Sequence, residues 1–267
     1  MMSATDFPQP NDTFRWVQAG PSGEPALVCA ALEPVARHLF TTRAWTLGGP
    51  VDEQPAGWAE VAAAVGAPVV RVRQVHGAGV LIHRAGQAAA TLPATDADVI
   101  LSDDPGVAIA IRAADCVPLL IGDSRTGVVA AAHAGWRGLA ARVPNVTVRA
   151  FEEAFASRPS DLVVAVGPSI SGPHYEVGQD VRQAFMASFG GGEISRWFSA
   201  GGKPGRWQFD GWAAVREQLE AAGVARERIF LSGLCTAAHP ALLCSYRRDG
   251  SPAGRMAAAI RSSRPRP

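Results

Sequence analysis

Three short segments carry side chains that could do chemistry, and each one lies at the edge of a predicted strand. The segments are residues 74–77 (QVHG), 114–118 (ADCVP) and 133–138 (HAGWRG). Their reactive groups are the imidazoles of His76 and His133 and the thiol of Cys116. Strand ends are positions at which a rigid sheet can present side chains to a cleft. The sequence therefore predicts one active site built from these three residues.

Two chemistries are open to Cys116. Two imidazoles and one thiolate suit Zn²⁺, and three protein ligands leave a fourth position open, as catalytic zinc sites do. Alternatively, a nearby imidazole lowers the pKa of a thiol and holds its proton, which would make Cys116 a nucleophile with His133 as its base. A thiolate bound to zinc is a poor nucleophile, so one residue can hardly do both. Taken singly, a buried cysteine or a strand-end histidine is more often structural.

Several further residues are candidates for binding a substrate. Arg137 follows a strand and Gly135 at the predicted start of a helix, where backbone N–H groups and a guanidinium can meet phosphate or carboxylate. The alternative is a surface arginine beside a tight turn. Arg43 and Arg247 are similarly ambiguous, because Arg247 lies in a stretch that could form a structural ion pair. Gln74, beside His76, completes this set of substrate-binding candidates.

Other polar and sulfur-containing residues are assigned supporting roles. Asp115 should point to the side of its strand opposite Cys116, since side chains alternate along a strand. Cys235 and Cys244 lack ligand spacing and are expected to be core thiols. His174 lies in a loop with Gly and Pro and could orient a substrate.

Buried strands are expected to position the reactive groups. Short apolar runs bounded by Gly, Pro, Asp or Ser predict strands over residues 97–101, 107–111, 117–121, 128–132 and 162–166. Alternation predicts another strand over 69–75, ending at His76. Shorter strands are predicted over 228–231 and 242–246. Because Cys116 and His133 lie on neighbouring strands, a hairpin-like connection could bring them together.

A few helices complete the expected fold. Helices are predicted over residues 58–65, 138–155, 179–189 and 212–222, with loops over 46–57, 190–192 and 201–205. Pro144 should kink its helix or delay its start. Clustered strands with helices packed outside argue against a Rossmann fold or a TIM barrel, and they favour an α+β sandwich.

Composition excludes several classes of protein. The chain has 267 residues, a formal net charge of +1 and interspersed charges, so no basic field points to nucleic acid. Four cysteines without CxxC spacing argue against a disulfide scaffold. No signal peptide or membrane-spanning run is visible, which predicts a cytoplasmic protein. The near-neutral charge and the lack of a coiled-coil pattern predict a monomer or small homo-oligomer. We expect a single domain over residues 1–267, with loose ends at 1–12 and 261–267.

The combined motifs resemble the bacterial YfiH-like family, whose members are also called laccase-domain or polyphenol oxidase-like proteins and peptidoglycan editing factor. The matching segments, in family order, are residues 38–43 (HLFTTR), 74–77 (QVHG), 95–98 (TDAD), 114–119 (ADCVPL), 133–138 (HAGWRG), 166–170 (VGPSI), 235–236 (CT), 245–249 (SYRRD) and 254–256 (GRM). They cover nearly the whole chain, and the HAGWRG string is specific.

The resemblance implies a layered α/β/β/α sandwich related to cysteine hydrolases, with His76, Cys116 and His133 as the metal ligands. It also implies a zinc-dependent purine nucleoside phosphorylase acting on adenosine, inosine, guanosine and methylthioadenosine, with adenosine deaminase activity. Older family labels imply a copper-dependent polyphenol oxidase, yet this sequence lacks the multiple His-x-His clusters that such oxidation needs. The remaining alternatives are a Cys–His hydrolase or amidase that edits peptidoglycan precursors, and a metal-stabilised binding protein.

Overall fold

Two six-stranded mixed sheets form the framework of the protein. The computed structural model describes residues 7–48, 56–88 and 95–264. In spatial order, the first sheet contains β1 (Phe14–Ala19), β2 (Glu24–Cys29), β3 (Ala36–Thr41), β15 (Met256–Ser262), β7 (Ala108–Ala113) and β4 (Val69–Arg71). The second sheet contains β14 (Ile229–Leu231), β10 (Leu162–Val166), β8 (Val117–Asp123), β9 (Val129–Ala134), β6 (Val99–Ser102) and β5 (Val80–His83).

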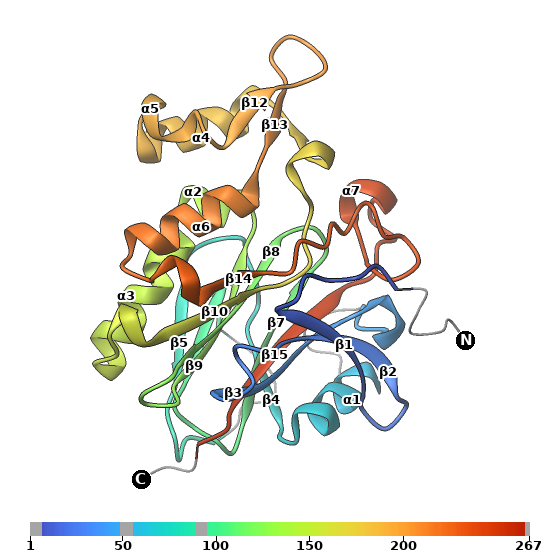
Figure 1. Cartoon of the computed structure of the whole chain (residues 1–267), viewed down its shortest axis with the longest axis vertical. Coiled ribbons are helices and arrows are strands. Elements are labelled where there is room, and N and C mark those ends of the chain that lie inside the picture. The colour runs from blue at the N-terminus through green and yellow to red at the C-terminus, as the bar shows by residue number, and fades with distance from the viewer. Residues whose placement is uncertain (1–6, 49–55, 89–94, 265–267) are drawn as a thin grey trace.

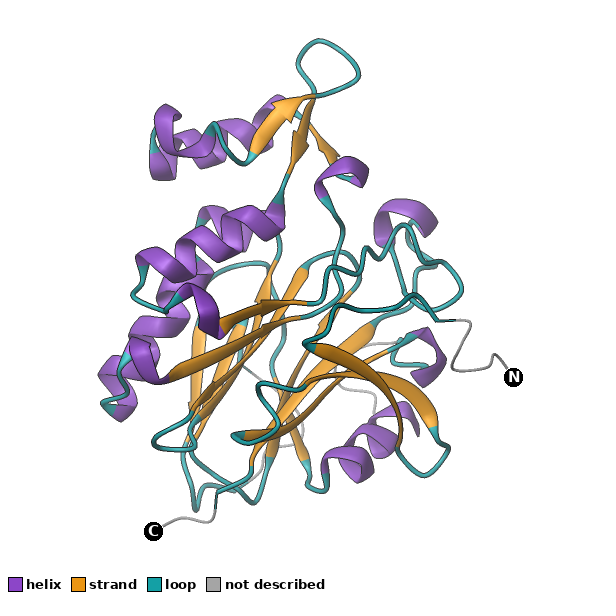
Figure 2. Cartoon of the chain, viewed as in Figure 1, coloured by secondary structure: helices purple, strands orange, loops and turns teal. Residues whose placement is uncertain are grey.

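Helices cover the sheets, and a small lobe extends from one end (Figures 1 and 2). The helices are α1 (Ala56–Val65), α2 (Trp136–Ala140), α3 (Val143–Phe155), α4 (Gln179–Phe189), α5 (Gly191–Ile194), α6 (Gly211–Ala221) and α7 (Tyr246–Asp249). The lobe, at the top of Figure 1, combines α4 and α5 with a three-stranded sheet of β11 (Glu176–Val177), β13 (Trp207–Phe209) and β12 (Phe198–Ala200). None of the described helices is long and apolar enough to cross a membrane.

Alternate residues of the central strands face different cores. In β8, Leu119 belongs to the core shared with α2, α3 and α6, whereas Leu120 belongs to the core between the two sheets. In β15, Ala258 faces the second sheet and Ala259 faces α1. Because side chains alternate along a strand and both faces are covered, these strands consist of almost continuous apolar runs.

The predicted α+β character is confirmed, and most predicted elements are found within one to three residues of their expected ends. The helical stretch over 138–155 is broken as Pro144 suggests. Arg142 adopts a left-handed conformation (φ 60°), and α3 then starts with Pro144 in its first turn. Proline is tolerated there because the first N–H groups of a helix have no partner within it.

Four local predictions are wrong in whole or in part. The strand predicted over 69–75 ends at Arg71, and Gly191 begins the short helix α5 where a loop was expected. Residues 242–246 form no strand, because Ser245 caps α7 by accepting the N–H of Arg248 at 3.2 Å. The loop predicted over 46–57 is shorter than expected, because α1 already begins at Ala56. Residues 49–55 of this loop lie outside the described part of the chain.

The described parts of both terminal segments are held in place. The ring of Phe7 lies 5.4 Å from that of Trp16, and the Asn11 amide donates to the carbonyl of Leu231 at 2.6 Å. Arg261 is part of β15 and donates to the carbonyl of Pro105 at 2.7 Å. The prediction of loose ends therefore does not hold for residues 7–12 and 261–264. Residues 1–6 and 265–267, to which the prediction also applies, lie outside the described part of the chain.

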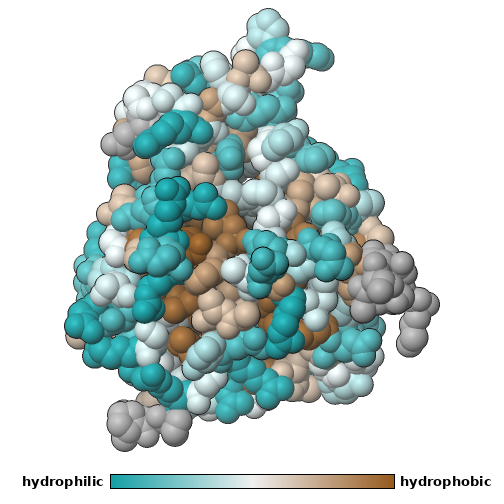
Figure 3. Space-filling model, viewed as in Figure 1, coloured by the Kyte–Doolittle hydropathy of each residue, from teal (hydrophilic) through white to brown (hydrophobic). Residues whose placement is uncertain are grey.

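The Asn11 contact protects an edge of the second sheet. β14 is the outermost strand on that side, and Leu231 is its last residue. Hydrophobic residues gather near the centre of the face drawn in Figure 3, where β10 and β14 lie in the same view of Figure 1. A hydrogen bond from the N-terminal segment to this strand satisfies a carbonyl that would otherwise be open to another chain.

Candidate metal centre

The hairpin of β8 and β9 brings Cys116 and His133 together. The two strands pair antiparallel, with Pro118 opposite His133 and Val117 opposite Ala134. Cys116 directly precedes β8, so it lies across from Gly135, which directly follows β9. A Cβ at Gly135 would lie only 2.9 Å from the sulfur of Cys116. Glycine at this position therefore leaves the room that the thiol occupies.

His76 reaches the same place from a turn after β4. Its backbone is left-handed (φ 60°), which is uncommon for a residue with a side chain and costs on the order of 1 kcal/mol. Three consecutive N–H groups in this turn donate to the carboxylate of Asp98, from Val75 at 3.2 Å, His76 at 3.0 Å and Gly77 at 2.7 Å. Asp98 is fully buried, so this group of bonds holds the strained turn in place.

The same carboxylate orients His133. Nδ1 of His133 lies 2.8 Å from Oδ1 of Asp98, and both side chains are buried. When Nδ1–H donates to the carboxylate, Nε2 remains as the ring nitrogen that can bind a metal. Burial raises the pKa of Asp98, but the hydrogen bonds from His133 and the backbone outweigh this effect and keep the pKa below its usual value. Asp98 thus couples the positions of both histidines.

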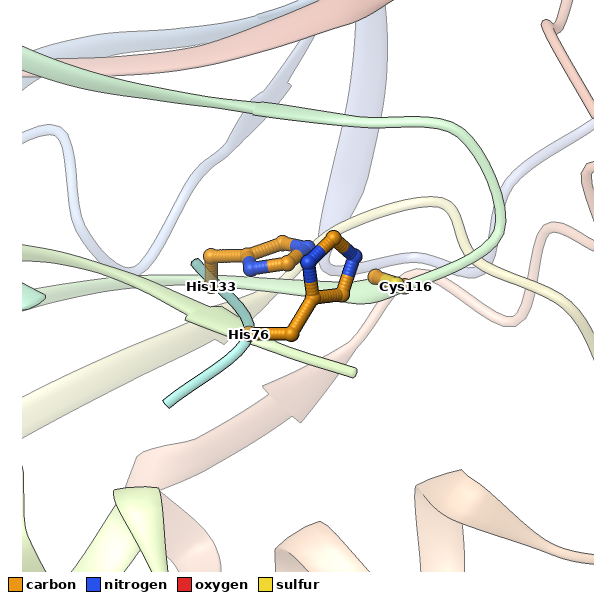
Figure 4. A group of neighbouring side chains, drawn as sticks. All are labelled: His76, Cys116 and His133. Atoms are coloured by element: carbon orange, nitrogen blue, oxygen red, sulfur yellow. The ribbon is translucent and has the colours of Figure 1, made fainter. Parts of the chain in front are cut away.

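Figure 4 shows the side chains of His76, Cys116 and His133 pointing toward one another. One ligand atom from each lies within 4.8 Å of the others, and the two imidazoles meet edge to face with ring centroids 4.8 Å apart. Small side-chain rotations bring such atoms to one ion. Two imidazole nitrogens and a thiolate are also a donor set that binds first-row transition metals well. The three residues therefore fit a metal ion.

Without a metal, Cys116 and His133 form a charged pair. Burial raises the pKa of the Cys116 thiol, but the charge of His133 and hydrogen bonds from both histidines lower it to about 6. Burial lowers the pKa of His133, whereas the thiolate of Cys116 and the hydrogen bond to Asp98 raise it to about 9. The thiol is thus prepared as a thiolate, the form that both metal binding and nucleophilic attack require.

The three residues lie in a pocket of about 620 Å³, a size typical of small-molecule sites. Its lining consists of Gln74, His76, Arg112, Ala113, Ala114, Asp115, Cys116, His133, Trp136, Arg137, Tyr175, Tyr246, Arg247 and Arg255. The pocket therefore brings the three candidate ligands together with Arg137, Arg247 and Gln74. Arg43 is not among the lining residues, and its guanidinium donates instead to the carbonyl of Pro240. The predicted role of Arg43 in binding a substrate is therefore not supported by its place in the structure.

Gln74 lies at the pocket with its amide already engaged. Its Nε2 donates to the carbonyl of Arg112 at 2.8 Å, and its Oε1 accepts the N–H of Arg112 at 2.8 Å. Both bonds join the turn before His76 to the end of β7. Gln74 therefore positions the backbone around the site in addition to lining it.

Asp115 supports the opposite wall. It adopts a positive φ of 83° and accepts hydrogen bonds from the hydroxyl of Thr236 at 2.5 Å and from the N–H of Arg247 at 2.6 Å. The guanidinium of Arg247 in turn donates to the carbonyl of Glu176 at 2.5 Å and lies 4.9 Å from the centre of the Tyr175 ring. This chain of contacts fixes Arg247 between the site and the lobe.

His174 and Cys235 form a separate pair behind this wall. The sulfur of Cys235 is 3.6 Å from Nδ1 of His174, and the hydroxyl of Ser171 is 3.1 Å from the same nitrogen. Cys235 and Cys244 are buried, as expected of core thiols. His174 does not line the pocket, so a substrate-orienting role for it has no support here.

Sequence reasoning missed four residues of this site. Arg255 and Asp98 lie within segments that match the family, residues 254–256 and 95–98, and that match was their available signal. Arg112 lies just after the strand predicted over 107–111, and Tyr175 follows the loop histidine His174. Neither carried a pattern that distinguishes a pocket residue from an ordinary one.

Known proteins share both the sequence and the fold. Residues 51–263 match a family model described as "Multi-copper polyphenol oxidoreductase laccase". A purine nucleoside phosphorylase of Deinococcus radiodurans is 39% identical over 240 residues, which is 84% of this chain and 88% of that protein. The purine nucleoside phosphorylase YfiH of Escherichia coli is 38% identical over 191 residues, 72% of each chain. The crystal structure of YlmD from Geobacillus stearothermophilus matches with a TM-score of 0.82 and 29% identity, over 95% of this chain and 100% of that one.

The fold and the site together define an α+β protein of the laccase-domain class, with a His–Cys–His group that could bind a metal. Within that class, the chain belongs to the YfiH family, whose relatives include YfiH and YlmD. Because the relatives from Deinococcus radiodurans and Escherichia coli carry the name purine nucleoside phosphorylase, they support the prediction of an enzyme.

Proposed function

We propose that the protein is a zinc-dependent purine nucleoside phosphorylase that accepts adenosine, inosine, guanosine and methylthioadenosine, and that it also deaminates adenosine. The single observation that carries the proposal is the placement of His76, Cys116 and His133 in a pocket whose walls hold arginines. Phosphorolysis needs a site that binds phosphate beside a nucleoside. Guanidinium groups are well suited to phosphate oxygens.

Zinc would be held by His76, Cys116 and His133, and when bound it supplies Lewis-acid chemistry. Arg137 would bind phosphate, and Arg247 lines the same pocket. The Arg137 guanidinium lies 4.2 Å from the centre of the Trp136 ring, and this contact restricts the motion of the Arg137 side chain. Preorganised positive charge lowers the cost of bringing phosphate to the ribosyl carbon. Asp98 would keep His133 oriented through turnover.

Zinc is preferred to copper because of the ligand chemistry. Among the described residues, one group of three ligands is present, whereas oxidation of phenols by several coppers needs several such groups. Zinc suits a mixed nitrogen and thiolate set with one open position. Elemental analysis of purified protein, followed by reconstitution with either metal, distinguishes the two.

The function is tested by chromatography of zinc-loaded protein incubated with adenosine, with and without phosphate. Adenine release that depends on phosphate is the expected result, and Cys116→Ala, which removes a ligand, should abolish it. Inosine that forms without phosphate would establish deamination alone. If neither product forms at any metal loading, the proposed function is wrong.

A second candidate is a Cys–His hydrolase or amidase that acts on peptidoglycan precursors, with Cys116 as nucleophile and His133 as base. The observation in its favour is the low pKa of Cys116 beside His133. Full metal retention in Cys116→Ala, together with complete loss of amide hydrolysis on muropeptide substrates, would favour this candidate over the phosphorylase.

The remaining proposals concern context. We propose that residues 1–267 form one domain with α/β/β/α layers related to cysteine hydrolases, and that it works in the cytoplasm as a monomer or small homo-oligomer without nucleic acid. Gel filtration and light scattering test the oligomeric state directly.

A further inference from the structure

A concentration of positive charge lies far from the metal centre, at the other end of β15. Arg37, Arg261 and Arg264 line a groove of about 570 Å³ together with small uncharged residues, and no carboxylate is among its described lining. We call this the basic groove. In Figure 1, β15 leads down to it, toward the C-terminal end of the chain at the bottom of the view. Arg255, which lines the metal-centre pocket, precedes the opposite end of β15, about 20 Å from Arg261 by the rise of a strand.

The register of the first sheet brings Arg37 and Arg261 together. β3 and β15 pair antiparallel, with Arg37 directly opposite Arg261. Both side chains lie on the face that α1 covers, because Leu39 and Ala259, two residues away on the same strands, belong to the core with α1. A Cβ at Gly66, directly after α1, would lie 3.0 Å from Nη1 of Arg261 and 3.6 Å from Nη1 of Arg37. The two guanidiniums therefore converge on one place, and like charges directly opposite in a sheet repel each other.

The contacts of these three arginines are with uncharged groups. Arg261 donates to three backbone carbonyls at 2.6, 2.7 and 3.3 Å, and two of these carbonyls lie at the end of α1, which supplies only a partial negative charge. Arg264 donates to two further backbone carbonyls. Within residues 7–48, 56–88 and 95–264, Arg37 forms no hydrogen bond or ion pair through its guanidinium. Backbone groups thus fix two of the side chains, and no contact balances the charge of the groove.

Acidic side chains beside the groove are engaged elsewhere. Asp104 lies 3.6 Å from the imidazole of His83 and accepts the N–H of Gly106 at 2.8 Å. Glu33, in the adjoining pocket, forms an ion pair with Arg15 at 2.5 Å. The positive charge of the basic groove is therefore available to an anion from outside the chain.

We propose that the basic groove binds a phosphate group, free or carried by an organic ester, at a site separate from the metal centre. Guanidiniums bind phosphate through paired charge-assisted hydrogen bonds, and a tetrahedral dianion offers oxygens to several guanidiniums at once. The hydroxyl of Ser263, an exposed residue of the groove, can donate to a further oxygen. Bound phosphate offsets the repulsion between Arg37 and Arg261. The inference does not rest on the proposed function, because no residue lines both the groove and the metal-centre pocket.

The surroundings of the groove leave room for more than the phosphate itself. A second pocket, of about 610 Å³, adjoins the groove and shares Arg37 and Ser263 with it. Its walls include the apolar residues Val17, Val28 and Leu39. The organic part of an ester can lie in this pocket while its phosphate contacts the arginines.

Calorimetric titration of the full chain with inorganic phosphate tests the proposal. Arg37→Met should weaken one phosphate site at least about 10-fold, as expected for the loss of charge-assisted hydrogen bonds, and Arg37→Lys, which loses the planar fork, should be intermediate. Arg149→Met is the matched control, because Arg149 is exposed on α3 and pairs only with Glu153 at 3.5 Å among its described contacts. Arg137→Met should keep the site that depends on Arg37.

Three results would overturn the proposal. The first is wild-type phosphate affinity at every site in Arg37→Met. The second is loss of all phosphate binding in Arg137→Met, which would assign that binding to the metal-centre pocket. The third is loss of the Arg37-dependent binding when sodium chloride holds the ionic strength constant, because general screening then accounts for it.

Phenyl phosphate distinguishes the two sources of the phosphate group. Binding at least about 10-fold tighter than that of inorganic phosphate, and dependent on Arg37, identifies an ester that also uses the adjoining pocket, whereas equal or weaker binding identifies free phosphate. Adenine release from adenosine should be unchanged in Arg37→Met. Phosphate binding that depends on Arg37, without any adenine release by the wild type, retains the groove and refutes the phosphorylase.

Discussion

Replacing Asp98 by asparagine changes one buried atom among the contacts that hold the candidate metal centre together. Oδ1 of Asp98 lies 2.8 Å from Nδ1 of His133 and accepts the N–H of His76, while Oδ2 accepts the N–H groups of Val75 and Gly77. An amide NH₂ in place of Oδ2 would face two donors, and the negative charge beside His133 would be lost. The strained turn at His76 would then lack most of its support.

The expected magnitude follows from these contacts. Two hydrogen bonds to a charged acceptor are lost, which predicts destabilisation of the metal-free protein by about 3 kcal/mol. That corresponds to a decrease in Tm of about 5–10 °C for a chain of this size. Loss of the carboxylate behind a metal-binding histidine should also weaken zinc binding by about 10-fold to 100-fold.

Both quantities can be measured on one pair of proteins. Thermal unfolding without metal gives the change in Tm, and competition with a chromophoric chelator gives the zinc affinity. Asp104→Asn is the matched control, because Asp104 also lies beside a buried histidine, His83, at 3.6 Å, but outside the metal centre. An Asp98→Asn protein that binds zinc as tightly as the wild type would refute the coupling of both histidines through Asp98.

The other predictions concern the ligands themselves. Gly135→Ala should weaken zinc at least about 10-fold with little change in Tm, since its Cβ would lie 2.9 Å from the Cys116 sulfur while φ stays negative. Equal zinc affinity in a chelator competition would contradict that steric reasoning. In metal-free protein, Cys116 has a pKa of about 6, so iodoacetamide labelling should be half-maximal near pH 6 and be lost below it. Mass spectrometry against Cys116→Ala as blank checks this, and a midpoint near pH 9 would refute the charged pair. His133→Ala should reduce turnover roughly 10²–10⁴-fold in the adenine-release assay, and a near-normal rate would remove its assigned role.

The position of Cys116 and His133 was accessible from the sequence. Two apolar runs separated by a turn predict a hairpin, and the register of β8 and β9 then places the two residues together. The position of His76 was not accessible in the same way. Its turn depends on Asp98, which is 22 residues away, and a bond of that separation leaves no periodic signal. The early end of β4 is also tied to a distant segment, because Arg73, two residues after β4, forms a backbone bridge with Asp96.

The least predictable strand is β15. Its sequence MAAAIRS is rich in alanine, which does not favour strands over helices, and no alternation marks it. It is a strand because β3 and β7 bind it from both sides, a long-range arrangement that local composition cannot report. The small lobe has a similar explanation, since its strands contain two or three residues each and are formed by pairing with one another.

The central place of β15 in the first sheet also sets an order of events during synthesis. β15 leaves the ribosome after every other described strand, yet it lies between β3 and β7, so those two strands have no neighbour on that side until then. The β8–β9 hairpin and its helices can assemble earlier, whereas the first sheet closes only after β15 has been synthesised. Arg255 directly precedes β15, so the nascent chain has all of its pocket arginines in place only when the strand that completes the sheet is added.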